Sequence, residues 1–308
     1  MDILLVGTYT QHDAPAVLEK QELGKGIYLI PYNEPLGGVA GTPFIIQMQN
    51  PSWVCLVKNR LFAVSESENA AEIVEYEVGV QKERLTAVKK AGLQMPGKAS
   101  CHIEKDEKGQ RLFVSDYGSG DLKVIDISEA GSPKLLQEIS FTGKGLDPER
   151  QEASHIHSCF LHRGDLYAAD LGCDKIYSFD TDKGKLLQKE TIDVRPGAGP
   201  RHMEILEKNG KTYLYVLNEL DITISVYCNG NLCQTISLEE NLPEGVLAAE
   251  LCIAEGKMLY ASVRGTGEIF GFTIEENGML SLRQKVVVPE GWFRSICLDS
   301  SEKHLLAA

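Results

Sequence analysis

Short apolar runs recur along the whole chain at a nearly constant spacing. Each run ends in a small or polar residue and is followed by a turn-like segment and a second apolar run. The seven runs begin at Leu4, Leu61, Leu112, Leu166, Leu214, Leu259 and Leu305. Successive starts lie 57, 51, 54, 48, 45 and 46 residues apart. A period of about 50 residues built from short strands indicates a blade-repeat protein, and neither a solenoid nor a two-domain enzyme.

Each repeat can be divided into four strands separated by turns rich in Gly, Ser and Pro. In the third repeat the pattern predicts strands at residues 101–105, 111–116, 121–127 and 134–140. In the fourth it predicts strands at 157–161, 166–170, 175–180 and 186–191. Residues 70–83 also fit a helix, but the apolar and polar positions alternate from Val74 to Val80. This alternation and the register of the repeat favour a strand.

Four antiparallel strands repeated about seven times are typical of a β-propeller, in which small sheets surround a central channel. The sequence therefore predicts an all-β, seven-bladed β-propeller that forms a single domain over residues 1–308. The first repeat lacks an innermost strand, and the last repeat has two strands before Ala308. We therefore expect the last blade to be incomplete at the C-terminus.

The charge of the chain narrows the classes of partner. The formal net charge is −13 and no run of Lys and Arg is present. An acidic chain without a basic patch argues against nucleic acid and anionic membranes as partners. An anionic small molecule would need a local positive cluster that opposes the overall field. The sequence shows no signal peptide and no apolar stretch of about 18 residues, so we expect a cytoplasmic protein, either a monomer or a weak homo-oligomer.

The eight cysteines show neither a C-x-x-C motif nor the spacing of a metal finger. Most of them lie within apolar strand text, where Cys serves as a small buried hydrophobic residue. We expect free thiols, as in a reducing compartment. The alternative is one bridge between Cys228 and Cys233, which flank an Asn-Gly turn and could face each other across a hairpin.

Strand direction predicts where the chemistry of this fold converges. The first two strands of a blade are antiparallel, so the start of the first and the end of the second lie at the same end of the blade. The starts carry Trp53, His102, His157, Arg201, His202, Glu250 and Arg294, and the ends carry Tyr9, Glu66, Asp116, Asp170, Glu219 and Arg264. A set of titratable groups at one mouth of the channel is the default site for such a fold.

Several of these residues have a purely structural alternative. Asp116 and Asp170 each precede a residue followed by Gly and could cap a turn, and His102 could be a hydrogen-bonded wall residue. His155 and His157 share one face of a strand and could bind a metal, although no third ligand stands at metal spacing. Packing gives no reason for the charged groups of Arg201, Glu219 and Arg264, which favours a functional role for them.

Two longer motifs carry a resemblance to a known family. Residues 197–203 read Gly-Ala-Gly-Pro-Arg-His-Met, and residues 215–220 read Tyr-Val-Leu-Asn-Glu-Leu. Weaker matches are Gly7-Thr8-Tyr9-Thr10, Asn50-Pro51-Ser52 and the segment from Tyr260 to Gly265. Together these motifs resemble the lactonase family of seven-bladed β-propellers over essentially the whole chain. The resemblance implies hydrolysis of a sugar-acid lactone, with phosphorylated 6-phosphogluconolactone as the expected substrate.

The resemblance also implies a catalytic set formed by His157, Glu219, Arg201 and Arg264, with no metal and no other cofactor. His157 is the expected base, Glu219 either orients it or accepts the proton itself, and the two arginines bind phosphate and stabilise developing negative charge. Among the other mouth residues, His102, Arg294, His202 and Asp170 are expected to bind substrate. Two alternatives keep the fold: a carboxymuconate-type cycloisomerase and a non-catalytic propeller scaffold.

Overall fold

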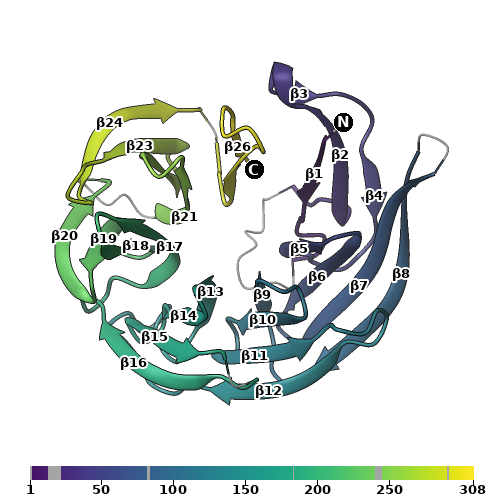
Figure 1. The fold of residues 1–308 in the computed structure, drawn as a ribbon, viewed down its shortest axis with the longest axis horizontal. Helices are drawn as coiled ribbons and strands as arrows, with labels where there is room; N and C mark the ends of the chain where they lie inside the picture. Colours follow the sequence, from purple (N-terminus) through teal and green to yellow (C-terminus); the bar gives the residue numbers. More distant parts are fainter. Residues whose placement is uncertain (1, 13–21, 82–83, 183, 240–244, 290) are drawn as a thin grey trace. The chain divides into compact units, whose positions relative to one another are not determined.

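The computed structural model describes residues 2–12, 22–81, 84–182, 184–239, 245–289 and 291–308. Within these ranges the chain forms strands and a single short 3-10 helix, η1 (Glu34–Leu36). Figure 1 labels the strands in chain order. No helix of the described residues combines the length and the hydropathy needed to cross a bilayer.

The described strands form six four-stranded sheets and one two-stranded sheet. The first sheet contains β1 (Asp2–Val6), β2 (Ile27–Asn33), β3 (Gly38–Val39) and β4 (Phe44–Ile46), and both β3 and β4 pair with β2. The second contains β5 (Trp53–Val57), β6 (Arg60–Ser67), β7 (Ala70–Gln81) and β8 (Arg84–Met95). The third contains β9 (Ser100–Lys105), β10 (Arg111–Asp116), β11 (Asp121–Asp126) and β12 (Lys134–Ser140).

The fourth sheet contains β13 (Ile156–His162), β14 (Asp165–Asp170), β15 (Lys175–Asp180) and β16 (Leu187–Asp193). The fifth contains β17 (Pro200–Lys208), β18 (Lys211–Asn218), β19 (Thr223–Cys228) and β20 (Asn231–Ser237). The sixth contains β21 (Leu247–Ala254), β22 (Met258–Arg264), β23 (Glu268–Ile274) and β24 (Leu280–Val287). The last contains β25 (Ile296–Leu298) and β26 (Leu305–Ala307).

These sheets confirm the prediction of an all-β chain of four-stranded antiparallel blades with an incomplete last blade. The strands expected in the third and fourth repeats lie within two residues of the observed ones. Residues 70–81 form strand β7 and no helix, because each residue from Ala71 to Gln81 pairs with a residue of β8. The eight cysteines are free, as predicted, and Cys228 and Cys233 form no bridge.

The chain divides into two compact units. The N-terminal unit comprises residues 1–142, 154–168 and 179–189, and the C-terminal unit comprises 143–153, 169–178 and 190–308. The boundary between them runs through the fourth sheet, whose strands contribute residues to both. The interpretation of the chain as a single domain over residues 1–308 stays a prediction.

Each unit contains apolar core clusters to which the second and third strands of the sheets contribute most of the buried residues. In the N-terminal unit Phe62 of β6 and Val114 of β10 are fully buried in one cluster. In the C-terminal unit Leu217 of β18 and Val263 of β22 are fully buried in another. These strands read as continuous apolar runs because both of their faces are covered. Their ends, where the apolar run stops, are the positions that carry polar groups.

A buried charge cluster interrupts the core of the third sheet. The Lys123 side chain of β11 is completely buried and forms an ion pair with Asp116, and its Nζ lies 3.6 Å from a carboxylate oxygen of Asp121. Ser100 donates a hydrogen bond of 2.6 Å to Asp116. Burial raises the pKa of Asp116 to about 6, and the nearby Lys123 and Ser100 oppose this rise. The contacts of Asp116 with Lys123 and Ser100 thus give it a structural role in the third sheet.

We expect the Lys123→Met variant to lose about 3–5 kcal/mol of unfolding free energy, because it leaves buried carboxylates without their counter-charge. Urea denaturation measures this loss. The double variant Asp116→Asn/Lys123→Met should recover part of it, since one of those carboxylates is then neutral. Equal stability of Lys123→Met and the wild type would contradict this account.

Candidate functional site

The two longest sequence motifs meet in the fifth sheet. The backbone N–H of Glu219 donates to the carbonyl of Gly199 at 2.7 Å, and that of Leu220 donates to Ala198 at 3.0 Å. Gly199 has a φ of 65°, and a Cβ there would lie 2.6 Å from Cγ of Leu220. The positive φ and the close approach both require glycine. The glycine turn at residues 197–199 thus joins the start of β17 to the end of β18.

Arg201 lies in a β-bulge, where the regular pairing of β17 with β18 is interrupted. Pro200 is opposite Asn218 and His202 is opposite Leu217, so Arg201 is the extra residue of a β-bulge. Bulges commonly re-aim a side chain next to a functional site. A second register shift lies between Ala248 and Leu251 of β21. The carbonyls of Ala249 and Ala248 in this segment accept hydrogen bonds from Arg201 and Arg264, respectively.

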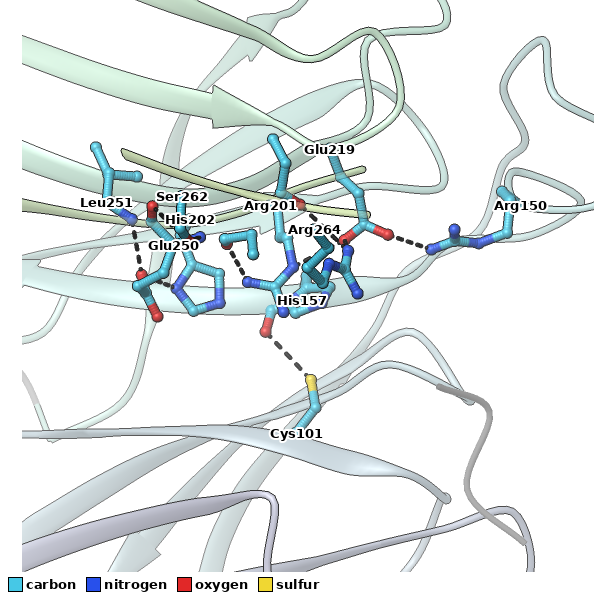
Figure 2. Close-up of polar contacts among 12 residues, drawn as sticks. Cys101, Arg150, His157, Arg201, His202, Glu219, Glu250, Leu251, Ser262 and Arg264 are labelled. Carbon is cyan, nitrogen blue, oxygen red and sulfur yellow. Dashed lines mark hydrogen bonds and ion pairs between the residues drawn. The ribbon is translucent and has the colours of Figure 1, made fainter. Parts of the chain in front are cut away.

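Three guanidinium groups surround one carboxylate at this point (Figure 2). Oε2 of Glu219 lies 2.8 Å from Nε of Arg201 and 3.1 Å from Nη2 of Arg264. Oε1 of Glu219 lies 2.6 Å from Nη2 of Arg150. We call these four residues the Glu219 cluster. All of them belong to the C-terminal unit.

The members of the Glu219 cluster differ in exposure. The side chains of Glu219, Arg201 and Arg264 are 2%, 3% and 5% exposed, whereas that of Arg150 is 34% exposed. Burial lowers the pKa of Arg264 to about 9, and Glu219 opposes this effect while Arg294 adds to it. Arg264 therefore remains protonated at neutral pH. The cluster places three positive charges against one negative charge in a protein whose net charge is −13.

A second polar pair lies beside the cluster on the same two sheets. Nδ1 of His202 is 2.6 Å from Oε1 of Glu250. Burial raises the pKa of Glu250 to about 8, opposed mainly by Arg201. Burial, and then the charges of Arg201 and Arg294, hold the pKa of His202 well below its ordinary range. Both shifts favour the uncharged forms of His202 and Glu250.

The remaining predicted residues have other surroundings. The half-buried Arg294 precedes β25, and its backbone N–H donates to Ala308 at 2.8 Å. Asp170 is fully buried and accepts hydrogen bonds from the N–H of Cys173 at 3.1 Å and from the hydroxyl of Tyr177 at 3.3 Å. This is the turn-capping role that the sequence left open for Asp170. A role for either residue in binding substrate stays a prediction.

His102 and His157, two further predicted site residues, belong to the N-terminal unit. His157 is buried, and its ring meets that of Tyr117 edge-on at 5.7 Å. Tyr117 stacks its face on His155 at 4.3 Å. The ring of His102 lies 4.2 Å from that of Trp53, and its Nδ1 accepts a hydrogen bond of 3.4 Å from the N–H of Cys159. His102 thus has the surroundings of a wall residue, and the functional roles of both histidines stay predictions.

Metal binding has no further support. Among the described residues no group of three or more His, Cys, Asp or Glu side chains is arranged to hold a metal ion. The ring of Tyr117 contacts both His155 and His157, the pair that the sequence left open as metal ligands. The expectation that the protein needs no cofactor stays a prediction.

The sequence reasoning missed Arg150. It lies outside the strands, in the connection between β12 and β13, which runs from Phe141 to His155. The rule that antiparallel strands bring their starts and ends together says nothing about residues in loops. The available signal was the length of the loop, since connections longer than about 12 residues are uncommon and often functional.

Comparison with known proteins gives a consistent result. A sequence model of the family described as "Lactonase, 7-bladed beta-propeller" matches residues 3–308. The chain is 32% identical over 305 residues to a 6-phosphogluconolactonase of Formosa agariphila, covering 92% of this chain and 85% of the relative. It is 26% identical over 317 residues to a 6-phosphogluconolactonase of Bacillus subtilis, covering 98% and 86%. A solved structure from Lactobacillus plantarum has a TM-score of 0.84 at 25% identity, covering 98% and 87%.

The neutral state of Glu250 makes the stability of the protein dependent on pH. The folded state keeps a proton on Glu250 up to about pH 8, whereas an ordinary carboxyl releases it near pH 4.5. The contribution of Glu250 to the unfolding free energy should therefore fall as the pH rises from about 4.5 to 8, by up to about 1.4 kcal/mol per unit. Below about pH 6.5 the lowered pKa of His202 opposes this fall, so the fall should be visible above that pH. The Glu250→Gln variant should show a shallower fall between about pH 7 and pH 8, where His202 is neutral in both states.

Chemical denaturation of both proteins across this pH range tests the expectation. The Glu276→Gln variant, which changes an exposed carboxylate of the same unit, serves as the matched control and should follow the wild type. If Glu250→Gln and the wild type lose stability in parallel, Glu250 is ionised in the folded protein.

Proposed function

We propose that this chain, which belongs to the lactonase family of seven-bladed β-propellers, hydrolyses a sugar-acid lactone, and that its substrate is 6-phosphogluconolactone. Two relatives that align over most of the chain carry the name 6-phosphogluconolactonase. The product would be 6-phosphogluconate, formed by addition of one water across the ester bond of the ring. The eight free cysteines support a reducing compartment, the cytoplasm, as the place of this reaction.

The observation that carries the proposal is the excess positive charge of the Glu219 cluster. Taking a guanidinium group out of water is costly unless an anion compensates it. All three guanidinium groups form ion pairs with the one carboxylate of Glu219, and the pKa shifts of the neighbouring His202 and Glu250 favour their uncharged forms. An anionic substrate that acquires further negative charge in the transition state fits this arrangement, whereas a neutral or cationic ligand does not.

Opening of a lactone requires a base, a stabilised oxyanion and a leaving alkoxide that takes up a proton. In this proposal His157 accepts a proton from water, which attacks the carbonyl carbon, and positioned base catalysis contributes roughly 10²–10⁴-fold. The carbonyl oxygen becomes an oxyanion, and the C–O bond of the ring then breaks. The protonated imidazole returns its proton to the ring oxygen that leaves.

The arginines supply electrostatic stabilisation in this scheme. Arg201 and Arg264 are held by Glu219 and by backbone carbonyls, so little reorganisation is needed when negative charge develops. Glu219 acts as the anchor of these guanidinium groups. A carboxylate that forms ion pairs with three guanidinium groups is a poor proton acceptor, so we propose His157 and not Glu219 as the base.

The decisive experiment follows acid release from freshly generated 6-phosphogluconolactone, with and without a chelator. We expect His157→Ala to lose about 10²–10⁴-fold in kcat, because the base is removed. Glu219→Gln should lose activity and also thermal stability, because the buried guanidinium groups lose their counter-charge. Circular dichroism must show that both variants fold.

Four results would contradict the proposal. Full activity of both variants would exclude the assigned residues, and loss of wild-type activity with the chelator would restore the metal hypothesis for His155 and His157. Turnover of a carboxymuconate in preference to the lactone would favour the cycloisomerase. Absence of turnover of either substrate would favour a binding scaffold.

A further inference from the structure

We propose that Arg150 is the residue that binds the phosphate of the substrate, and that the loop from Gly143 to Ala153 exists to hold it in place. This inference deepens the proposed function and rests on it for the identity of the substrate. We call residues 143–153 the arginine loop. The loop, the Glu219 cluster and the glycine turn all belong to the C-terminal unit.

The arginine loop is folded around one buried side chain, that of Gln151. Its Oε1 accepts hydrogen bonds from the N–H groups of Leu146 at 2.9 Å and Asp147 at 3.1 Å. Its Nε2 donates to the carbonyl of Leu171 at 2.8 Å and to Oδ1 of Asp174 at 2.8 Å. Gln151 is fully buried, and its bonds to Leu171 and Asp174 are buried as well. A loop held in this way has one defined conformation.

The backbone of Arg150 is fixed within the same loop. Oδ1 of Asp147 accepts hydrogen bonds from the N–H groups of Glu149 at 2.9 Å and Arg150 at 3.0 Å. The N–H of Gln151 donates to the carbonyl of Asp147 at 2.9 Å. These contacts orient the start of the Arg150 side chain, which then extends toward Glu219 (Figure 2).

Asp174 connects the arginine loop to the glycine turn that precedes Arg201. Its Oδ1 accepts from the N–H of Gly199 at 2.8 Å as well as from Gln151, and its Oδ2 accepts from the N–H of Gly197 at 2.7 Å. One carboxylate therefore positions two of the three segments that carry guanidinium groups to Glu219, those of Arg150 and Arg201. The arrangement makes Arg150 an integral part of the site and not a chance neighbour of it.

Exposure separates the roles of the three arginines. Arg201 and Arg264 are almost completely buried and also donate to backbone carbonyls, so they are suited to a fixed role at the reacting carbonyl. Arg150 is one-third exposed and approaches Glu219 from a loop. Of the three guanidinium groups, that of Arg150 is therefore the most accessible to an anion from solution. A phosphate can take two parallel hydrogen bonds from such a group.

The test compares ligands that differ only in the phosphate. Calorimetric titration with 6-phosphogluconate and with gluconate gives the phosphate preference as the ratio of the two dissociation constants. We expect the wild type to prefer 6-phosphogluconate by about tenfold or more, and Arg150→Ala to lose most of this preference. Arg195→Ala is the matched control, because Arg195 is an exposed arginine of the same unit that pairs with Asp221. The control should keep the wild-type ratio.

The outcomes separate this inference from the proposed function. Lactone turnover by the wild type with an unchanged phosphate preference in Arg150→Ala would overturn the inference and leave the function standing. Binding of 6-phosphogluconate that depends on Arg150, without lactone turnover, would support the inference and overturn the function. A wild type that binds 6-phosphogluconate no more tightly than gluconate would overturn the inference.

The positioning role of Gln151 has its own readout. Gln151→Ala should lower the phosphate preference as Arg150→Ala does, and the double variant should lose no more than Arg150→Ala alone. This non-additivity arises because Gln151 acts through Arg150. Additive losses in the double variant, or loss of stability with an intact phosphate preference, would show that Gln151 serves only the fold of the loop.

Discussion

The ion pairs of Glu219 are the interaction on which the rest of this site depends. One buried carboxylate collects guanidinium groups from the bulge of β17, the end of β22 and the loop that follows β12. Without it, buried positive charges would repel one another across a few ångströms in a medium of low dielectric constant. Glu219 reduces that repulsion without cancelling it, and the residual positive charge is what an anionic ligand would meet.

Local charge here opposes the charge of the whole protein. A net charge of −13 repels small anions at long range, and salt screens that repulsion within about 10 Å. An anion bound as proposed would lie within the screening length of the guanidinium groups, so their field would outweigh that of the distant charges. Burial raises the pKa of Glu250 and so favours its uncharged form, whereas an ionised Glu250 would neutralise part of this field.

The strand pattern was predictable because a fixed period and an alternation of apolar and polar residues report directly on burial. The meeting of Arg201, Glu219 and Arg264 was also predictable, since antiparallel pairing places strand starts and strand ends at one end of a sheet. Arg150 was not predictable in this way. Its position depends on the buried side-chain amide of Gln151 and on the carboxylate of Asp174, which accepts hydrogen bonds from both the arginine loop and the glycine turn. The periodicity of the strands gives no information about these contacts. The turn-capping contacts of Asp170 were foreseen only as an alternative, because a carboxylate at a strand end looks the same in sequence whether it faces a turn or a ligand.

The shared carboxylate of Asp174 has a consequence for engineering this scaffold. Replacing residues 143–153 by the corresponding segment of a relative would replace Arg150, the proposed phosphate donor. The side-chain amide at position 151 must still bond to Asp174, whose carboxylate already accepts two backbone N–H groups of the glycine turn. A graft that shifts this acceptor by a few tenths of an ångström would disturb Arg201 as well. In the proposed site the arginine loop and the glycine turn are therefore best exchanged together, because Asp174 holds both.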